Sequence, residues 1–464
     1  MIGYSPFDKP LNEVETEDLE VLKRTFEGWH VEYKEKVPDA GKIASSISSF
    51  ANTDGGWVFY GVKEKSKAEP VAGSFPGIDV GDVERKRQSI ESAVPGNTSP
   101  VPHFEMKIVW GPCAKIGLPN DRAIFCINVP WSVQAPHVHR NGRIYRRDGA
   151  QSDPKAENDR FLLDQLWRRS DEIKQGYKEW IEMDQEFSEA EKQTLYVRLL
   201  FVLDFWGHRR VQIYRPINEL RQLLKAPSSP FALNFHSVYT TSNGFIARQH
   251  GGDDPGTLGL TWRIFDDLSS DILIPFSVRT TSNRDHIRRD FSDYPEEFVQ
   301  ALIQQGFTRP RVIDFDPLIW ALIAISMTYN RLLEEAQWKE GVFYKVQLLN
   351  AWRTSPVLGA PVMLAAFQEH GVPVFLRTQG LSPPGTDPES FLYTRRLTEG
   401  QDTEAGAILR GIQLFDGIAE MYGLPQLPVG DDNEKFMQYL KELAGAADRY
   451  MERQWPGPQR MAGH

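Results

Sequence analysis

Three short segments near the amino end decide the expected fold. They are Glu27-Gly28-Trp29-His30-Val31-Glu32-Tyr33-Lys34, then Ile47-Ser48-Ser49-Phe50-Ala51-Asn52-Thr53-Asp54-Gly55-Gly56, and then Val58-Phe59-Tyr60-Gly61-Val62. The first alternates like a short strand from residue 30 to 34. The second has apolar residues on one helical face and ends in a glycine pair, which lets a helix stop and turn. The third is an apolar run typical of a buried strand, so the order strand, helix, strand is predicted.

The neighbouring segments extend this unit to about residue 169. Thr16 can cap a helix with apolar positions Leu19, Leu22 and Phe26, ending near Gly28. Downstream, we expect a helix at 83–93, strands at 104–110 and 123–129, a basic hairpin at 140–147 and a helix at 156–169. This mixed order of helices and strands predicts an α+β domain over residues 1–169.

The remaining chain shows a different pattern, for which we expect a mixed α/β and helical region. Ser188 with Glu191 is a capping-box pattern that predicts an apolar helix to about Trp206, linking the two halves. Asn243-Gly244 lies between two strand-like runs and predicts a hairpin. Strand-like runs at 260–265 and 272–277 would continue that sheet.

Helices dominate the last part of the sequence. Asp316-Pro317 can open a helix over 318–333, and further helices are expected at 404–422 and 433–453. The sequence therefore predicts a linker helix and β-containing domain at 170–310 and a mainly helical domain at 311–454. Residues 455–464, which are rich in Pro and Gly, are expected to form a loose tail.

Composition excludes several classes of protein. The net charge of -10 means that nucleic-acid binding would need a local basic surface. Cys113 and Cys126 are too few for a disulfide framework or a cysteine-based zinc site. No secretory signal is visible, and the longest apolar stretch, 318–327, is about half the roughly 20 residues of a membrane span. We expect a cytoplasmic protein.

The three opening segments, taken together, resemble the AlbA-like (AlbA_2) domain of the Schlafen family. That domain has a Glu-aromatic-Lys strand, a helix ending in Phe-Ala-Asn-Thr and a glycine pair, and an apolar strand ending in Gly-Val. Pro136-His137 and the stretch from Ile144 to Ala150 resemble its closing segment, so the likeness covers about residues 15 to 168. The resemblance implies a nucleic-acid partner, with RNA favoured and DNA as an alternative.

The resemblance also implies a set of catalytic residues. In Schlafen members that cut RNA, two glutamates five apart and a downstream Asp bind a metal ion. Glu27 and Glu32 fall on the glutamate positions, whereas Lys63 stands at the Asp position with Glu64 next to it. The implied site therefore has Glu27, Glu32 and Glu64 as ligands of Mg²⁺ or Mn²⁺, with Lys34 near the phosphate. The alternative is a solvated Glu32–Lys34 ion pair and a surface Glu64.

A second group of residues is predicted to bind the phosphate backbone. Lys63 belongs to it, together with the densest cationic segment of the chain: His137, Arg140, Arg143, Arg146 and Arg147. A groove lined by such side chains tracks a polyanion. The alternative is a solvated hairpin whose arginines pair with nearby acids such as Asp148 and Asp153.

Three functions remain open from the sequence. One is a metal-dependent endoribonuclease acting on structured RNA such as tRNA, in bacterial antiphage defence. Another is a non-catalytic DNA- or RNA-binding regulator. The third is ATP or nucleotide binding at the glycine turn after Asn52, although no Walker-type Gly-Lys-Ser/Thr is present. The C-terminal half is expected to bind a protein partner or to form a homo-oligomer. The serines at 45, 46, 48 and 49 are expected to face solvent.

Overall fold

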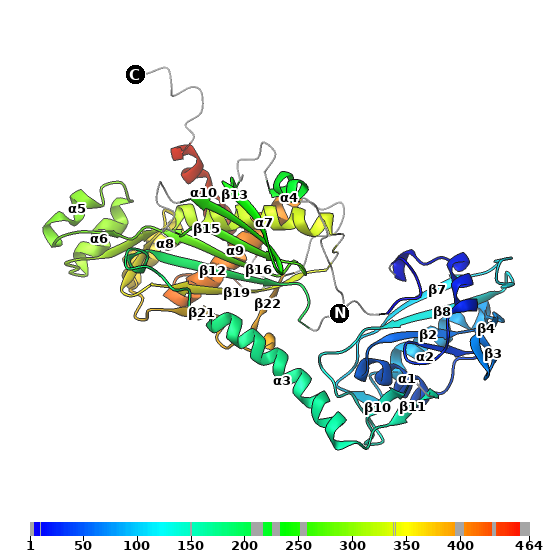
Figure 1. Ribbon diagram of the computed structural model, residues 1–464. Coiled ribbons are helices and arrows are strands. Elements are labelled where there is room, and N and C mark those ends of the chain that lie inside the picture. Colours follow the sequence, from blue (N-terminus) through cyan, green and yellow to red (C-terminus); the bar gives the residue numbers. More distant parts are fainter. Residues whose placement is uncertain are drawn as a thin grey trace. The chain divides into compact units, whose positions relative to one another are not determined.

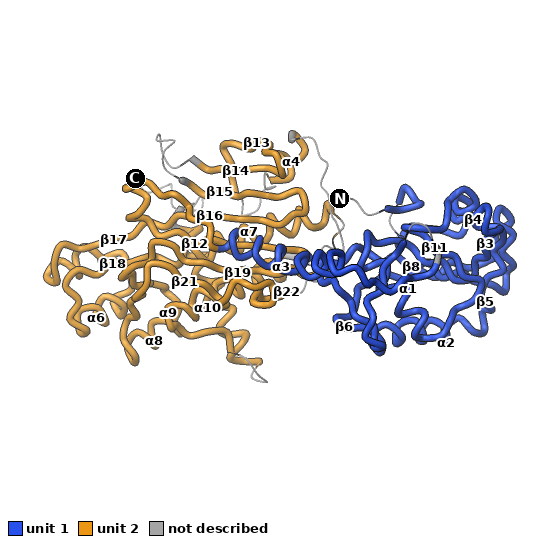
Figure 2. The backbone as a smooth tube through the Cα atoms, turned by 60° about the horizontal axis from the view of Figure 1, so that its bottom comes forward, with its two compact units in different colours: residues 1–181, 204–210 blue, residues 182–203, 211–464 orange. Residues whose placement is uncertain are grey.

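The structure is a computed structural model that describes residues 4–9, 11–148, 151–205, 217–224, 233–250, 258–336, 338, 340–394, 403–428 and 433–454. The chain divides into two compact units, 1–181 with 204–210 and 182–203 with 211–464 (Figure 2). Helices and strands mix in both units, which confirms the α+β class. In the described ranges, no helix is both long and apolar enough to cross a membrane.

Unit 1 is built around a five-stranded sheet in the order β1-β2-β8-β5, with β7 also paired to β8 (Figure 1). Its strands are β1 (Val31–Lys34), β2 (Gly56–Tyr60), β5 (Ile78–Asp79), β7 (Glu105–Trp110) and β8 (Arg122–Val129). Strands β1 and β2 run parallel, and α1 (Ala40–Asn52) is the crossover between them. The predicted strand, helix and strand are therefore confirmed.

Side chains pack on both faces of this sheet. Ile43, Ile47 and Phe50 of α1 bury against one face together with Ile90 of α2 (Val83–Ala93). Leu19 and the residues around it bury against the other face. Asp39 caps α1, since its Oδ1 accepts a 3.0 Å hydrogen bond from the Lys42 backbone N–H.

Shorter elements complete unit 1. They are the 3₁₀ turns η1 (Leu11–Glu13), η2 (Thr16–Arg24) and η3 (Val80–Asp82), the strands β3 (Lys63–Ser66), β4 (Glu69–Ser74), β6 (Thr98–Ser99), β9 (Val138–His139), β10 (Tyr145–Asp148) and β11 (Gln151–Ala156), and the helix α3 (Arg160–Glu182). Strands β3 and β4 pair with each other, as do β10 and β11. The β10–β11 pair carries Arg146 and Arg147 of the predicted basic segment.

The first predicted helix is wrong in type and in its cap. Residues 16–24 form the 3₁₀ helix η2, whose N-cap is Glu15 in a capping box with Asp18. The Thr16 hydroxyl instead donates to the Trp110 carbonyl, 2.9 Å away. Leu19 and Leu22 are three residues apart, which suits the period of a 3₁₀ helix as well as one face of an α-helix.

Unit 2 is built on an eight-stranded sheet in the order β13-β14-β15-β16-β12-β19-β21, with β22 also paired to β19. Its strands are β12 (Leu195–Val202), β13 (Ser237–Thr241), β14 (Gly244–His250), β15 (Leu258–Phe265), β16 (Ser270–Phe276), β19 (Val342–Leu349), β21 (Gly380–Ser382) and β22 (Leu392–Thr394). A second sheet joins β17 (Arg279–Thr280), β18 (Arg311–Asp314) and β20 (Thr354–Val357). Thr241 pairs with Gly244, which confirms the Asn-Gly hairpin.

The helices of unit 2 are α4 (Ile217–Leu224), α5 (Ile287–Asp290), α6 (Glu296–Gln304), α7 (Asp316–Glu335), α8 (Pro361–His370), α9 (Thr403–Tyr422) and α10 (Asn433–Gln454), with 3₁₀ turns at Glu191–Gln193, Arg284–His286 and Pro388–Ser390. One hydrophobic core includes Trp262, Ile319 and Phe415. Both sides of the predicted boundary at residue 310 therefore contribute to this core. The predicted tail, 455–464, lies outside the described residues.

The linker helix predicted from Ser188 to Trp206 is wrong. The Ser188–Glu191 capping pair forms, with the Ser188 backbone N–H donating to Glu191 at 2.8 Å, but it opens only the short turn Glu191–Gln193. The apolar run that follows is β12, a central strand buried over its whole length. Such a run is compatible with either a buried helix or a buried strand. Trp206 lies outside the described residues. The chain passes from unit 1 into unit 2 at the end of α3.

Candidate nucleic-acid interface and acidic cluster

Strand β1 places Glu32 and Lys34 on one face of the sheet, because side chains two residues apart in a strand share a face. Glu32 is only 2% exposed. One of its carboxylate oxygens accepts a hydrogen bond from Arg147 at 2.9 Å and another from the Ser46 hydroxyl, and the other oxygen lies 3.3 Å from Lys34 Nζ. The buried carboxylate is thus neutralised by two cations, as a buried charge requires.

Arg147, the cation that donates to Glu32, lies on β10. Its side chain is 0% exposed, and its guanidinium lies 4.5 Å from the ring centre of Phe50. It also donates a 2.7 Å hydrogen bond to the Gly28 carbonyl. Burial lowers the pKa of the Arg147 guanidinium, while the nearby Glu32 opposes that change. In this position Arg147 links β10 to the loop before β1 and is out of reach of a phosphate in solution.

Glu27 lies in that loop, close to the other acids. Its Oε1 accepts a 2.9 Å hydrogen bond from the Tyr33 backbone N–H. The pKa of Glu27 is raised to about 7, mainly because the side chain is buried; the Tyr33 N–H and Lys34 oppose this rise, and the charges of Glu32 and Glu64 add to it. The three acids of the predicted site therefore interact electrostatically.

Lys63 and Glu64 stand on β3, where the pairing register with β4 shifts between them. Lys63 is exposed and lies 3.3 Å from Glu35, so part of its charge is already balanced. Glu64 is half-buried. Its charge contributes to the raised pKa of Glu27.

The donor set does not fit a divalent ion in this arrangement. A catalytic divalent ion needs several carboxylate oxygens converging on one point. Among the residues described, no three His, Cys, Asp or Glu side chains come together closely enough to hold a metal. Both oxygens of Glu32 are also engaged by Arg147, Ser46 and Lys34.

The cationic segment divides into buried and exposed members. His137 is 0% exposed, its backbone N–H donates to Asn52 Oδ1 at 2.7 Å, and burial lowers its pKa to about 4. It is therefore neutral at pH 7 and does not attract phosphate. Arg146 is half-buried and lies 3.3 Å from Glu157.

Arg140 and Arg143 are the exposed members. They lie on the tight turn between β9 and β10, which is closed by a 2.9 Å hydrogen bond from the His139 backbone N–H to the Arg143 carbonyl. Neither guanidinium has an ion-pair partner within the part of the chain that the structure describes. Of the predicted phosphate-binding residues, these two are the ones that are exposed and lack an ion-pair partner among the described residues.

The glycine turn after Asn52 is arranged as a helix end. The backbone N–H groups of Thr53 and Gly55 both donate to the Phe50 carbonyl, at 3.0 and 2.9 Å. These donors are used by α1, and the carboxyl end of a helix carries partial negative charge, which disfavours phosphate. A Cβ on Gly55 would lie 2.7 Å from the Trp131 backbone nitrogen, so close packing explains this glycine.

The sequence did not lead us to expect that the polar side of α1 is buried. Ser46, Ser48 and Ser49 are buried and do not face solvent. Asn52 is buried as well, and its amide donates to the carbonyls of His137 and Tyr145 at 3.0 and 2.9 Å. A signal was present, because Ser46 is three residues after Ile43 and thus on the same helical side.

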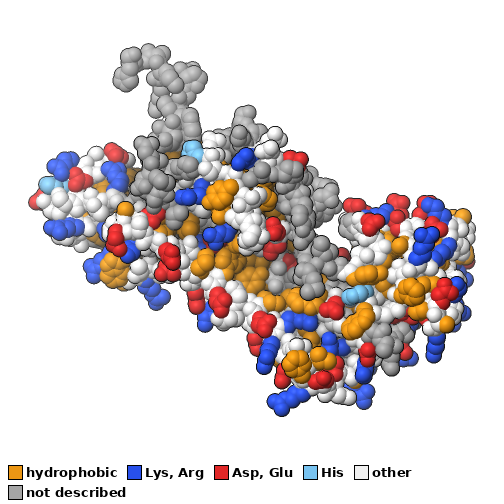
Figure 3. Space-filling model, viewed as in Figure 1, with side chains coloured by type: hydrophobic (Ala, Val, Ile, Leu, Met, Phe, Trp, Pro, Cys, Tyr) orange, Lys and Arg blue, Asp and Glu red, His pale blue; other side chains and the backbone are white. Residues whose placement is uncertain are grey.

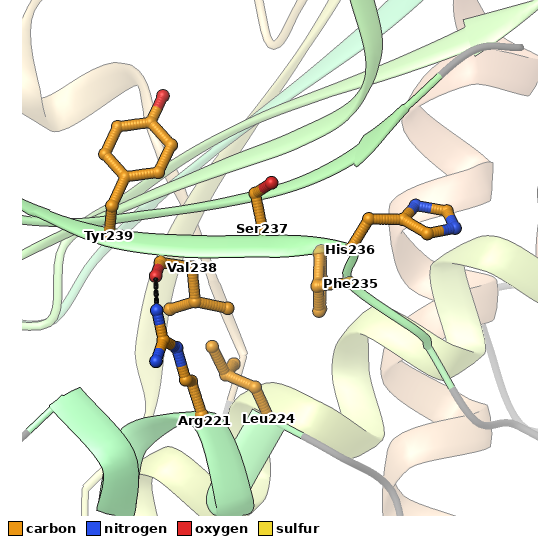
Figure 4. A pocket seen from close by; sticks show the side chains of 7 residues that line it. All are labelled: Arg221, Leu224, Phe235, His236, Ser237, Val238 and Tyr239. Atoms are coloured by element: carbon orange, nitrogen blue, oxygen red, sulfur yellow. Dashed lines mark hydrogen bonds between the residues drawn. The ribbon is translucent and has the colours of Figure 1, made fainter. Parts of the chain in front are cut away.

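Other described surfaces give weaker evidence of a binding site. On the face seen in Figure 3, acidic and basic side chains are interspersed over unit 1. In unit 2 a cavity of about 430 Å³ lies between α4 and β13, lined by Arg221, Leu224, Phe235, His236, Ser237, Val238 and Tyr239 (Figure 4). There Arg221 donates to the Val238 carbonyl at 2.8 Å. This hydrogen bond links helix to strand and indicates no ligand.

Unit 1 is thus an α+β domain with an exposed basic turn. The family model of the Schlafen AlbA_2 domain matches residues 27–156, which confirms the resemblance predicted for this part of the chain. The match indicates nucleic-acid binding; it ends at residue 156, within unit 1, and covers none of unit 2.

The other comparisons add little. The chain is similar to the crystal structure of the DIP2311 protein from Corynebacterium diphtheriae, at 15% sequence identity and a TM-score of 0.20. That similarity covers 35% of this chain and 35% of the other. Among curated proteins, none matches the sequence significantly.

Proposed function

We propose that residues 27–156 bind nucleic acid without cutting it, and that Arg140 and Arg143 contact the phosphate backbone. The observation that carries the proposal is the state of Glu32. Glu32, which would have to bind the metal ion in a nuclease, is buried and paired with Arg147 and Lys34. The exposed arginines on the β9–β10 turn, in contrast, are available to a ligand.

The charge of the whole chain makes a local contact necessary. At a net charge of -10, a polyanion is repelled at long range, so binding depends on the few cations at the interface. Each phosphate that a cation neutralises releases counterions, which makes affinity fall with salt. We therefore expect weak salt dependence in total, with most of it due to this turn.

The test is the affinity of the full chain for a labelled RNA and a labelled DNA at several salt concentrations. Arg140→Ala with Arg143→Ala should weaken binding about ten-fold at low salt and lower the salt slope by roughly 1 to 2. The control is Lys65→Ala with Lys67→Ala, which removes two positive charges from the exposed β3–β4 hairpin, where Lys65 is paired with Glu69. Equal losses in the two variants would show that the turn is not the interface.

A metal-dependent endoribonuclease is the second candidate, and Glu27 is the observation that favours it. A carboxyl with a pKa of about 7 beside two other acids is suited to proton transfer at neutral pH. Under this candidate the substrate would be structured RNA such as tRNA, with Mg²⁺ or Mn²⁺, in bacterial antiphage defence. Cleavage of labelled tRNA that needs either metal, and that Glu27→Gln abolishes while binding persists, would replace the binding-only proposal.

A further inference from the structure

Two large aromatic side chains stand exposed in the loop between η2 and β1. Phe26 is 65% exposed and Trp29 is 46% exposed, one on each side of Gly28 in the sequence. The described part of the chain holds no ring that stacks on either of them. Exposed aromatic rings are the groups on which the bases of single-stranded nucleic acid stack.

The backbone of this loop is fixed at several points. The Gly28 carbonyl accepts the 2.7 Å hydrogen bond from Arg147, and the Gly28 N–H donates to the Val31 carbonyl at 2.9 Å. The Glu27 N–H donates to the Pro70 carbonyl at 2.6 Å, and the Tyr33 hydroxyl donates to the Thr25 carbonyl at 2.9 Å. The rings are therefore presented from a rigid frame, which lowers the entropic cost of binding.

Cationic groups border the same loop. Arg24, the last residue of η2, is exposed, whereas Lys34, about one-third exposed, is paired with Glu32 and Asp153. The basic turn is also within reach, because Arg147, which holds Gly28, is four residues beyond Arg143, or roughly 13 Å along extended chain. Exposed rings beside such cations match the pattern of sites that bind single-stranded nucleic acid, in which bases stack on aromatic side chains.

We propose that Phe26 and Trp29 form a stacking surface for unpaired bases, so that this domain prefers single-stranded segments of nucleic acid to duplex. This inference rests on the proposed function and specifies its ligand. In a duplex the faces of the bases are covered by their neighbours, so a stacking surface can act only on unpaired bases. The contacts of Arg140 and Arg143 to phosphate would be common to both ligand forms.

The experiment compares three ligands of equal length with the full chain: a labelled oligothymidine, an abasic strand with the same phosphates, and a duplex. The wild-type protein should bind the oligothymidine about ten-fold more tightly than the abasic strand. Phe26→Ala with Trp29→Ala should remove that advantage and leave the affinity for the abasic strand unchanged. Trp29→Phe, which keeps a ring, should retain most of it.

Trp110→Ala is the matched control. Trp110 is 49% exposed, and its carbonyl accepts the hydrogen bond from Thr16 at the opposite end of η2. This variant should bind all three ligands as the unvaried protein does. Equal affinity of the unvaried protein for oligothymidine and abasic strand would overturn the stacking surface and leave the phosphate contacts standing. Binding of neither strand would overturn the proposed function as well.

Discussion

Glu32 and Arg147 depend on each other for stability. Removing one partner of a buried ion pair leaves the other charge buried and uncompensated, which costs about 3–5 kcal/mol. We therefore expect Glu32→Ala to lower the free energy of unfolding of unit 1 by about that amount, as measured by urea denaturation. Loss of activity in this variant would then report instability and not a catalytic role.

A double variant separates charge from packing. Glu32→Gln with Arg147→Met removes both charges and keeps similar side-chain volumes, so it should recover much of the stability lost in Glu32→Ala. If Glu32→Ala is as stable as the unvaried protein, the carboxylate is not buried against Arg147 and the case against a metal site weakens.

Glu27 should make stability depend on pH. Its pKa in the folded protein is raised from 4.5 to about 7, so the folded state holds its proton more tightly than the unfolded state does. The free energy of unfolding should therefore fall as pH rises from about 4.5 to about 7 and level off above. Because the side chain is partly exposed, we expect a total effect of about 2 kcal/mol.

Glu27→Gln isolates this effect. Glutamine keeps the oxygen that accepts the Tyr33 hydrogen bond and does not ionise. The variant should match the unvaried protein in urea denaturation near pH 4.5 and exceed it in stability by about 2 kcal/mol at pH 8. His137 also titrates in acid, but it contributes equally to both proteins. A difference that does not change with pH would mean that the Glu27 pKa is ordinary.

At the scale of elements, local patterns predicted the amino-terminal unit well. The helix Ala40–Asn52 and its flanking strands follow from apolar spacing and from glycines that end a helix. The Asn-Gly hairpin needs only two residues to be recognised. Strand β12 was mistaken for a helix because its burial comes from β16 and β19, which pair with it from about 75 and 150 residues further along the chain.

The candidate site also shows that local sequence patterns do not predict which side chains are buried. Arg140, Arg143, Arg146 and Arg147 look alike in sequence, yet the fold buries one, half-buries another and exposes two. Adjacent residues of a strand point to opposite faces, so Arg146 and Arg147 must differ, but only the position of α1 decides which of them is buried. The resemblance located the domain, whereas these individual roles required the structure.

At the scale of the molecule, each unit has its own hydrophobic core. Unit 1 packs side chains on both faces of its sheet, and unit 2 packs its helices on β12 and its neighbours. In β12 one face contributes Leu199 and Phe201 to the core, where Phe201 stacks on Tyr329 of α7 with ring centres 4.7 Å apart. The other face carries Arg198, paired with Asp271 at 2.8 Å. Separate cores imply that each unit can unfold without the other.

Hydrogen exchange read by mass spectrometry in increasing urea can test this independence, because peptides report each unit separately. Leu199→Ala should remove about 2–5 kcal/mol of packing from unit 2, so amides of β12 and β19 should exchange at lower urea while those of β1 and β2 stay protected. Glu32→Ala should do the reverse. If either substitution lowers protection equally in both units, the two cores unfold as one cooperative body, and the assignment of nucleic-acid binding to an autonomous amino-terminal domain loses its physical basis.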